Sequence, residues 1–271
     1  GTDGPDVTIL TCSEGLEGAT VNVFSGSISI QSTDDCINAA NADLTGYSYA
    51  LNIFGGTITA RSDSGDGFDS NGDLTISGGY VTVWTANAAD NEPLDADGTV
   101  TVSGGTVLAA GGSGGMGMSL AAAQPCVIFG GTTEMPGGNM QNWQPGAGGQ
   151  PGGKEPPSGE ARPGGEGQPA QGVFGGGASL LTQDNSFTVA NSDGTTLYTG
   201  EAVYNASFVF FSSADLSDGE SYTLTSGETQ TESTAQTGTV TIGMGGMGSM
   251  GGQKPDGTPP FGGMGDQKPE I

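Results

Sequence analysis

The phrase VNVFSGSISI, which begins at Val21, returns as LNIFGGTITA at Leu51, LTISGGYVTV at Leu74 and VTVSGGTVLA at Val100. The copies therefore begin 30, 23 and 26 residues apart. Self-similarity at this length is typical of repeat proteins, in which each copy is one structural unit.

Each copy alternates apolar and polar residues on both sides of a Gly-containing break, a pattern that predicts two short strands joined by a sharp bend. Copies stacked about 4.8 Å apart would place like residues on like in continuous apolar columns. The sequence therefore predicts an all-β fold, a parallel β-helix. The four columns are Val21, Leu51, Leu74 and Val100; Val23, Ile53, Ile76 and Val102; Ile28, Ile58, Val81 and Val107; and Ile30, Ala60, Val83 and Ala109.

Composition divides the chain into four parts. Residues 1–135 are expected to form the coils, with further coils expected upstream because the chain starts inside a repeat. Residues 136–177 are rich in Gly and Pro and predict a disordered loop or linker. Residues 178–227 alternate again, without the repeat phrase, and predict a small β cap that closes the solenoid. Residues 228–271 predict a flexible tail.

A less complete fifth copy, CVIFGGTTEM, begins at Cys126 and would align Phe129 with Phe24 and Phe54. Three cysteines, at positions 12, 36 and 126, are an odd number and fall in different columns. They are expected to be small buried residues rather than disulfide partners or metal ligands.

The chain is strongly acidic, with 30 Asp and Glu against 5 Lys and Arg and a net charge of −25. Such a surface repels nucleic acid and anionic lipid and attracts cations. No stretch approaches the roughly 20 apolar residues of a membrane span. The Gly-rich composition is that of an extended, loop-rich, secreted or cell-surface protein. The oligomeric state is left open.

A second repeating element precedes the strand phrases: SEGLEG from Ser13, DDCINA from Asp34, GDGFDSNG from Gly65 and NEPLDADG from Asn91. Alignment on the apolar residue of each element creates two polar columns, in which seven of eight positions are carboxylates. The aligned apolar residues are Leu16, Ile37, Phe68 and Leu94, and the polar columns are Glu14, Asp35, Asp66 and Glu92, and Glu17, Asn38, Asp69 and Asp95.

Stacked carboxylates about 5 Å apart repel by roughly 3 kcal/mol at an effective dielectric of 20. Clustered Asp, Glu and Asn oxygens suit Ca²⁺, whereas the absence of His disfavours zinc. The alternative is that the acids only make turns and keep the surface soluble. The richest ligand set is expected between the third and fourth coils. The candidate metal ligands are Glu14, Glu17, Asp34, Asp35, Asn38, Asp66, Asp69, Asn71, Glu92, Asp95 and Asp97.

Aromatic residues at outward positions could stack on sugar rings. Phe24 and Phe54 lie just before the bend, and Tyr80 and Trp84 lie on the neighbouring strand. Cover beneath a loop or cap is the alternative role for all four. Arg61 could pair with a sugar carboxylate or form a structural ion pair with Asp63.

Four segments between Ser13 and Met116 resemble those of a family of secreted bacterial carbohydrate-binding proteins: SEGLEGATVNV, STDDCINAA, LNIFGGTITARSDSGDGFDSNGDLTISGGYVTV and PLDADGTVTVSGGTVLAAGGSGGM. A looser match covers the region from SLLTQDNSF to YTLTSG. The resemblance implies a right-handed parallel β-helix that binds calcium and recognises polygalacturonate (pectin) and cellulose. An acidic protein should reject an acidic polymer unless a cation bridges the two, so calcium binding and pectin binding are expected to be linked.

The predicted function is non-catalytic, calcium-dependent binding of plant cell-wall polysaccharide. One alternative is a pectin lyase or hydrolase on the same fold, which stacked carboxylates could serve. The absence of His, and Arg61 as the sole candidate for a cationic base, disfavour it. A second alternative is a structural or adhesive stalk that calcium stiffens.

Overall fold

The repeat phrases fold as short parallel strands stacked in register. The computed structural model describes residues 3–41, 43–44, 46–88, 91–112, 118–130 and 179–242. Within these residues the secondary structure is all β, without a helix. The predicted all-β class is confirmed.

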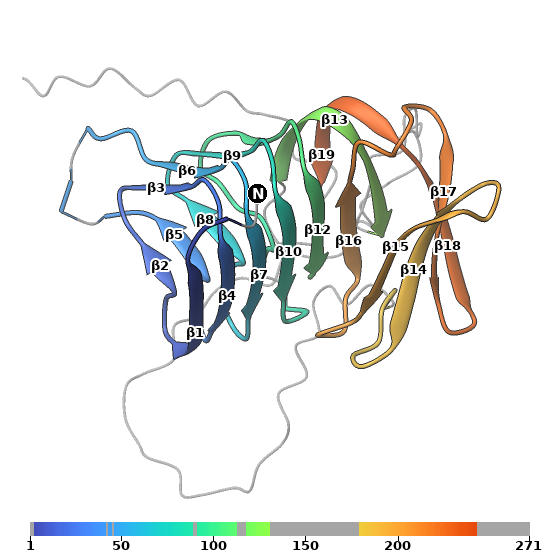
Figure 1. The fold of residues 1–271 in the computed structure, drawn as a ribbon, viewed down its shortest axis with the longest axis horizontal. Helices are drawn as coiled ribbons and strands as arrows, with labels where there is room; N and C mark the ends of the chain where they lie inside the picture. The colour runs from blue at the N-terminus through green and yellow to red at the C-terminus, as the bar shows by residue number, and fades with distance from the viewer. Residues whose placement is uncertain are drawn as a thin grey trace, which may run out of the picture.

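The strands that follow the bends form one parallel ladder, seen side by side in Figure 1. From β4 onward each strand keeps a single register with the next, so that Ile28 pairs with Ile58, and Ile58 with Val81. The pairing of β1 with β4 shifts register between Ile9 and Cys12. In order, the strands are β1 (Asp6–Cys12), β4 (Ser27–Ser32), β7 (Thr57–Ser62), β10 (Tyr80–Thr85) and β12 (Thr106–Gly111).

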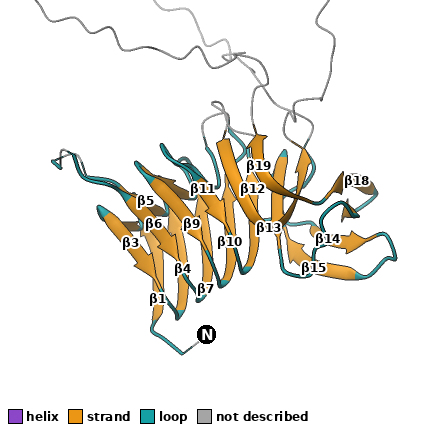
Figure 2. Cartoon of the chain, turned by 90° about the horizontal axis from the view of Figure 1, so that it is seen from above, coloured by secondary structure: helices purple, strands orange, loops and turns teal. Residues whose placement is uncertain are grey.

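The strands that precede the bends form a second parallel ladder on the opposite side of the core (Figure 2). Leu51 pairs with Leu74, and Leu74 with Val100, as the alignment of the repeats predicts. These strands are β3 (Thr20–Val23), β6 (Ala50–Ile53), β9 (Asp73–Ile76), β11 (Val100–Val102) and β13 (Met118–Gly130).

A third, shorter ladder contains the apolar residues of the acidic elements. It consists of β2 (Leu16–Glu17), β5 (Ile37–Ala39) and β8 (Phe68–Ser70), and an isolated bridge adds Leu94 to it. The residues of all three ladders that point inward form one apolar core, in which most members of the predicted columns have no solvent exposure.

The second glycine of each bend explains the Ser-Gly and Gly-Gly pairs of the repeat. Gly56 and Gly79 both have a φ of +99°, a left-handed conformation that side chains disfavour. A Cβ on Gly79 would also lie 2.8 Å from the backbone oxygen of Gly56 in the preceding coil. Both the turn and the close approach of neighbouring coils therefore require glycine.

The large sheet is not wholly parallel. Strand β16 (Phe208–Ser212) pairs antiparallel with β12 on one side and with β13 on the other, and β19 (Gln236–Ile242) pairs antiparallel with β13. The C-terminal region thus supplies strands to the repeat sheet itself, in addition to the small cap that the sequence predicts.

A second sheet of four antiparallel strands follows in the order β15, β14, β17, β18. Its bounds are β14 (Ser186–Asn191), β15 (Thr196–Glu201), β17 (Ser221–Ser226) and β18 (Thr229–Thr234). One face packs on the outer side of the large sheet through a separate apolar core that includes Trp84, Phe187 and Phe211.

Two boundary predictions are wrong. The expected tail from residue 228 contains β18 and β19, because alternating Thr, Glu and Val residues there complete both sheets. The fifth repeat also does not begin at Cys126, because Leu120 and Ala122 of β13 are the residues that pair with Val100 and Val102. The Gly/Pro-rich segment 136–177 and residues 243–271 lie outside the described residues.

Candidate functional site

The third ladder fixes the positions of the acidic residues. Because Ile37 pairs with Phe68, Asn38 lies in register with Asp69, and Glu17 lies in register with Asn38. The N–H of Gly67 donates to the carbonyl of Glu92 at 2.9 Å, which continues the same stacking into the next coil. The two polar columns predicted from the sequence are therefore present.

Three carboxylates of the two richest coils converge on one point. One oxygen from each of Asp66, Asp69 and Asp95 lies within 4.8 Å of the other two, and all three side chains are half-buried. We call these three residues the acidic cluster. Oxygens that share one Ca²⁺ at 2.3–2.6 Å lie at most about 5 Å apart, so the spacing fits a calcium ion.

The electrostatics of the acidic cluster disfavour three negative charges without a cation. The pKa of Asp66 rises to about 8, mainly because burial disfavours its charged form, and the Asp35 and Asp95 carboxylates raise it further. Burial, followed by the Asp35 and Asp95 carboxylates, raises the pKa of Asp69 to about 7. At neutral pH the cluster therefore holds protons unless a cation replaces them.

Hydrogen bonds hold Asp66 of the acidic cluster and the neighbouring Asp35 in place. Asp66 Oδ1 accepts a 2.6 Å bond from the N–H of Glu92, and Asp35 Oδ1 accepts a 2.8 Å bond from the N–H of Asp66. Each acid is thus anchored to the backbone of the next coil. Burial raises the pKa of Asp35 as well.

Asn38 supplies an independent indication of a cation. Its Nδ2 donates to Asp35 Oδ2 at 3.0 Å and to Glu14 Oε2 at 3.4 Å. Its Oδ1 is buried and has no donor, while the whole residue is only 9 % exposed. A buried acceptor without a donor is costly, and an amide carbonyl is a ligand that calcium accepts, so the residues fit this ion.

The other predicted ligands lie around the acidic cluster or at the surface. Glu92 is half-buried beside Asp66, and Glu14 is half-buried beside Asn38. Glu17, Asp34, Asn71 and Asp97 are exposed. Within the described residues, Asp66, Asp69 and Asp95 are the one group of acids whose oxygens converge in this way.

Two of the predicted aromatic residues form an exposed platform. The rings of Phe24 and Phe54 lie parallel, with centroids 4.9 Å apart and an interplanar angle of 10°. The side chains are 68 % and 45 % exposed. We call this pair the phenylalanine platform, and its flat apolar face suits a sugar ring.

The predicted sugar-binding role of Trp84 is wrong. Trp84 is only 2 % exposed, because β14 covers it and Phe187 meets its ring edge-on at 5.9 Å. Phe129 pairs with Val209 and is fully buried, so it does not share the column of Phe24 and Phe54. Both residues belong to the core beneath the C-terminal sheet, which is the alternative role considered for the aromatic residues.

Tyr80 and Arg61 lie near the junction between the large sheet and the C-terminal region. Tyr80 remains 45 % exposed and stacks on Tyr198 of β15, with ring centroids 6.4 Å apart. Arg61 is half-buried on β7, and the nearby Asp63 carboxylate accepts a hydrogen bond from Tyr204. The contacts of Tyr198 and Tyr204 with this region were not predicted. Both tyrosines lie more than 100 residues further along the chain, outside the repeats, so the repeat pattern does not indicate where they pack.

The three cysteines are free, as expected. Cys36 and Cys126 are fully buried and Cys12 is half-buried. Burial raises the pKa of Cys36 to about 11 and that of Cys126 to about 12. None of the three thiols has the low pKa of a reactive or metal-binding cysteine.

Residues 11–115 match the model of a family described as "Carbohydrate-binding domain-containing protein". The matched region contains the acidic cluster, Asn38 and the phenylalanine platform. The match supports a carbohydrate-binding role for the repeat region, with a polysaccharide as the partner, and favours binding over catalysis.

No curated protein and no solved structure matches the chain. Among the described residues, no helix is long and apolar enough to cross a membrane.

Proposed function

We propose that this chain is a secreted or cell-surface protein that binds plant cell-wall polysaccharide without cleaving it, in a calcium-dependent manner. The fold proposed for this role is a right-handed parallel β-helix, which the three parallel ladders support. Polygalacturonate is the proposed main ligand, and cellulose is a second one. The observation that carries the proposal is the convergence of Asp66, Asp69 and Asp95 within 4.8 Å.

Calcium would be held by the acidic cluster, with Asp35, Asn38 and Glu92 as further candidates for ligands. The one converging oxygen of each acid fills three of the six to eight ligand positions that calcium takes. The remaining positions suit the carboxylates of a uronate chain. A bound ion supplies a positive charge between two acidic partners, and without it a chain with a net charge of −25 repels polygalacturonate.

A neutral polysaccharide needs a different contact, because it offers no carboxylate to a cation. The phenylalanine platform supplies the flat apolar surface on which a sugar ring stacks. Tyr80 adds a further exposed aromatic ring, which stacks on Tyr198. Cellulose binding therefore rests on the aromatic residues and uronate binding on the acidic cluster.

The decisive experiment measures retention on insoluble polygalacturonate and on cellulose, each with excess calcium and with chelator, while the melting temperature is followed. Retention on polygalacturonate that chelator abolishes, with the fold intact, is the expected result. If calcium raises the melting temperature but the protein is retained on neither polymer, the acidic cluster is structural and the proposal fails.

Asp69→Asn tests the acidic cluster directly, and Asp193→Asn at the exposed hairpin after β14 is the control matched for charge. The first variant should lose calcium-dependent retention on polygalacturonate, whereas the second should retain it. Equal losses in both variants would indicate a general effect of charge rather than a calcium site.

A further inference from the structure

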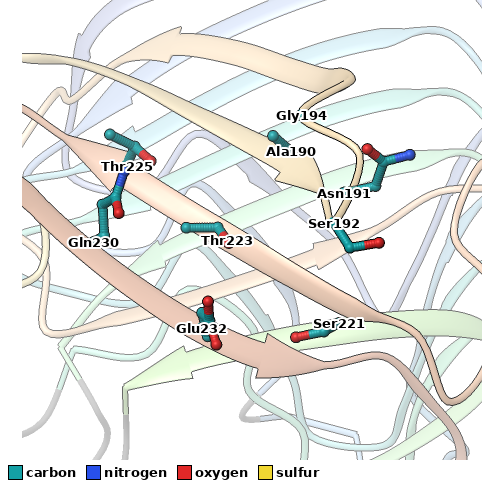
Figure 3. Close-up of a pocket in the computed structure, with 9 residues that line it drawn as sticks. All are labelled: Ala190, Asn191, Ser192, Gly194, Ser221, Thr223, Thr225, Gln230 and Glu232. Carbon is teal, nitrogen blue, oxygen red and sulfur yellow. The ribbon is translucent and has the colours of Figure 1, made fainter.

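The outer face of the C-terminal sheet carries a hollow of about 460 Å³, shown in Figure 3. Ligand pockets commonly measure about 300–1,000 Å³, so this space suits a sugar unit. We call it the C-terminal hollow. It is lined by Ala190, Asn191, Ser192, Gly194, Ser221, Thr223, Thr225, Gln230 and Glu232.

Strand alternation explains why these side chains face outward. Phe187, Val189 and Leu224 point into the core beneath the sheet, so their neighbours Ala190, Thr223 and Thr225 point to the opposite face. The register then aligns the polar groups across strands. Thr223 lies between Ala190 of β14 and Glu232 of β18, and Thr225 lies beside Gln230.

The polar groups of the C-terminal hollow are available to a ligand. Within the part of the chain that the structure describes, the side chains of Thr223, Thr225, Gln230 and Glu232 make no hydrogen bond. Asn191 Oδ1 accepts from the N–H groups of residues 193 and 195, which fixes the side chain and leaves its Nδ2 as a donor. The lining thus combines hydroxyl, amide and carboxylate groups.

This chemistry favours a neutral, hydroxyl-rich ligand. Hydroxyl and amide groups both donate to and accept from sugar hydroxyls, and Glu232 can accept a charge-assisted bond. The lining contains no cationic side chain, and the acidic chain disfavours an anionic ligand such as a uronate.

We propose that the C-terminal hollow is a second carbohydrate site, which takes a neutral sugar unit without calcium. The inference shares with the proposed function the general class of ligand but uses neither the acidic cluster nor the phenylalanine platform. One protein could then hold an acidic polymer through its coils and a neutral glycan through its C-terminal sheet.

The test is an NMR titration of the full chain, in the presence of chelator, with cellotetraose, mannotetraose and galacturonic acid. The expected result is that at least one neutral oligosaccharide shifts the amide signals of β17 and β18, and that galacturonic acid does not. Thr223→Val, which removes a hydroxyl and keeps the β-branched shape, should weaken that binding by about three- to tenfold. Thr59→Val on the exposed face of β7 is the matched control and should leave it unchanged.

The inference is overturned if neither neutral oligosaccharide shifts these signals, if galacturonic acid shifts them equally, or if Thr223→Val binds as the parent chain does. Retention of Thr223→Val on polygalacturonate with calcium should remain at the parental level. A failure of this inference is therefore distinguishable from a failure of the proposed function.

Discussion

Asp66 receives a 2.6 Å hydrogen bond from the backbone N–H of Glu92, one coil further along the chain. Asp35 receives the equivalent bond from the N–H of Asp66. Successive coils thus hold each other's carboxylates in place before any cation arrives. A site built in this way loses little conformational freedom when it binds an ion.

Asp69→Asn should have opposite effects with and without calcium. In chelator at pH 8, the loss of a half-buried negative charge should raise the melting temperature by a few degrees, because burial and then the Asp35 and Asp95 carboxylates disfavour the charged form of Asp69. With calcium at about 100 times its dissociation constant, the parent chain should gain about 2.7 kcal/mol and the variant much less. Calorimetry in both buffers measures the two effects. A variant stabilised by calcium as strongly as the parent contradicts the site.

The calcium-free protein should become less stable as the pH rises from about 4 to about 8. The folded pKa values of Asp66 and Asp69, about 8 and about 7, lie above the ordinary value of 3.8. The folded state therefore binds more protons than the unfolded state across this range, and stability falls with pH. Urea melts in chelator at several pH values measure the trend. Saturating calcium should flatten it, and a rise of stability over this range would show that the acidic cluster is already ionised without penalty.

Phe54→Ala and Trp84→Ala should separate binding from stability. Phe54 is 45 % exposed and stacks on one neighbour, so its loss should reduce retention on cellulose and change stability by less than about 1 kcal/mol. Trp84 lies in the core beneath the C-terminal sheet, and its truncation should cost about 3–5 kcal/mol. Denaturant melts and cellulose retention assays check both. If Phe54→Ala is retained on cellulose like the parent chain, the phenylalanine platform has no role in sugar binding.

Gly79→Ala should destabilise the protein more than Gly194→Ala. Both glycines have a positive φ, +99° and +80°, so both substitutions strain the backbone by roughly 1–2 kcal/mol. A Cβ at Gly79 would in addition approach the Gly56 oxygen to 2.8 Å, whereas a Cβ at Gly194 would meet nothing within 4 Å. The difference between the two free energies of unfolding measures the close packing of coils at the bend. Equal values would show that the coils can move apart there.

The coils could be predicted from the sequence because the residues that determine them lie close together in the chain and recur in each repeat. The Gly pairs, the apolar columns and the alignment of Asn38 with Asp69 follow from four similar phrases, and pairing in register preserves that alignment in space. The convergence of Asp66, Asp69 and Asp95 follows from the same alignment. The lack of a hydrogen-bond donor to Asn38 Oδ1 could not be predicted, because it depends on the orientation of the side-chain amide.

Contacts between distant segments account for what was missed. Trp84 follows the outward alternation of its strand, yet a sheet more than 100 residues later covers it. The repeats likewise give no indication that β16 lies between β12 and β13. All five residues of β16, Phe208 to Ser212, are buried, so the strand lacks the alternation of apolar and polar residues that marks the coils. The pairing of Leu120 with Val100 was also missed. Strand β13 continues beyond this pairing to Cys126–Gly130, which pair with β16, and the sequence of that second part resembles the repeat phrase more closely.

The positions of β16 and β19 have a consequence for how the protein behaves in solution. The last parallel strands of a solenoid present rows of unpaired N–H and C=O groups, which can recruit a strand from another molecule and start a fibre. Here β16 bonds to β12, the last strand of the first ladder, and β19 bonds to the Met118–Ala122 part of β13, which ends the second ladder. Both strands run antiparallel and so interrupt the parallel stacking that a fibre would continue. The C-terminal region thus pairs the last strands of these two ladders, and we expect its removal to promote aggregation through them.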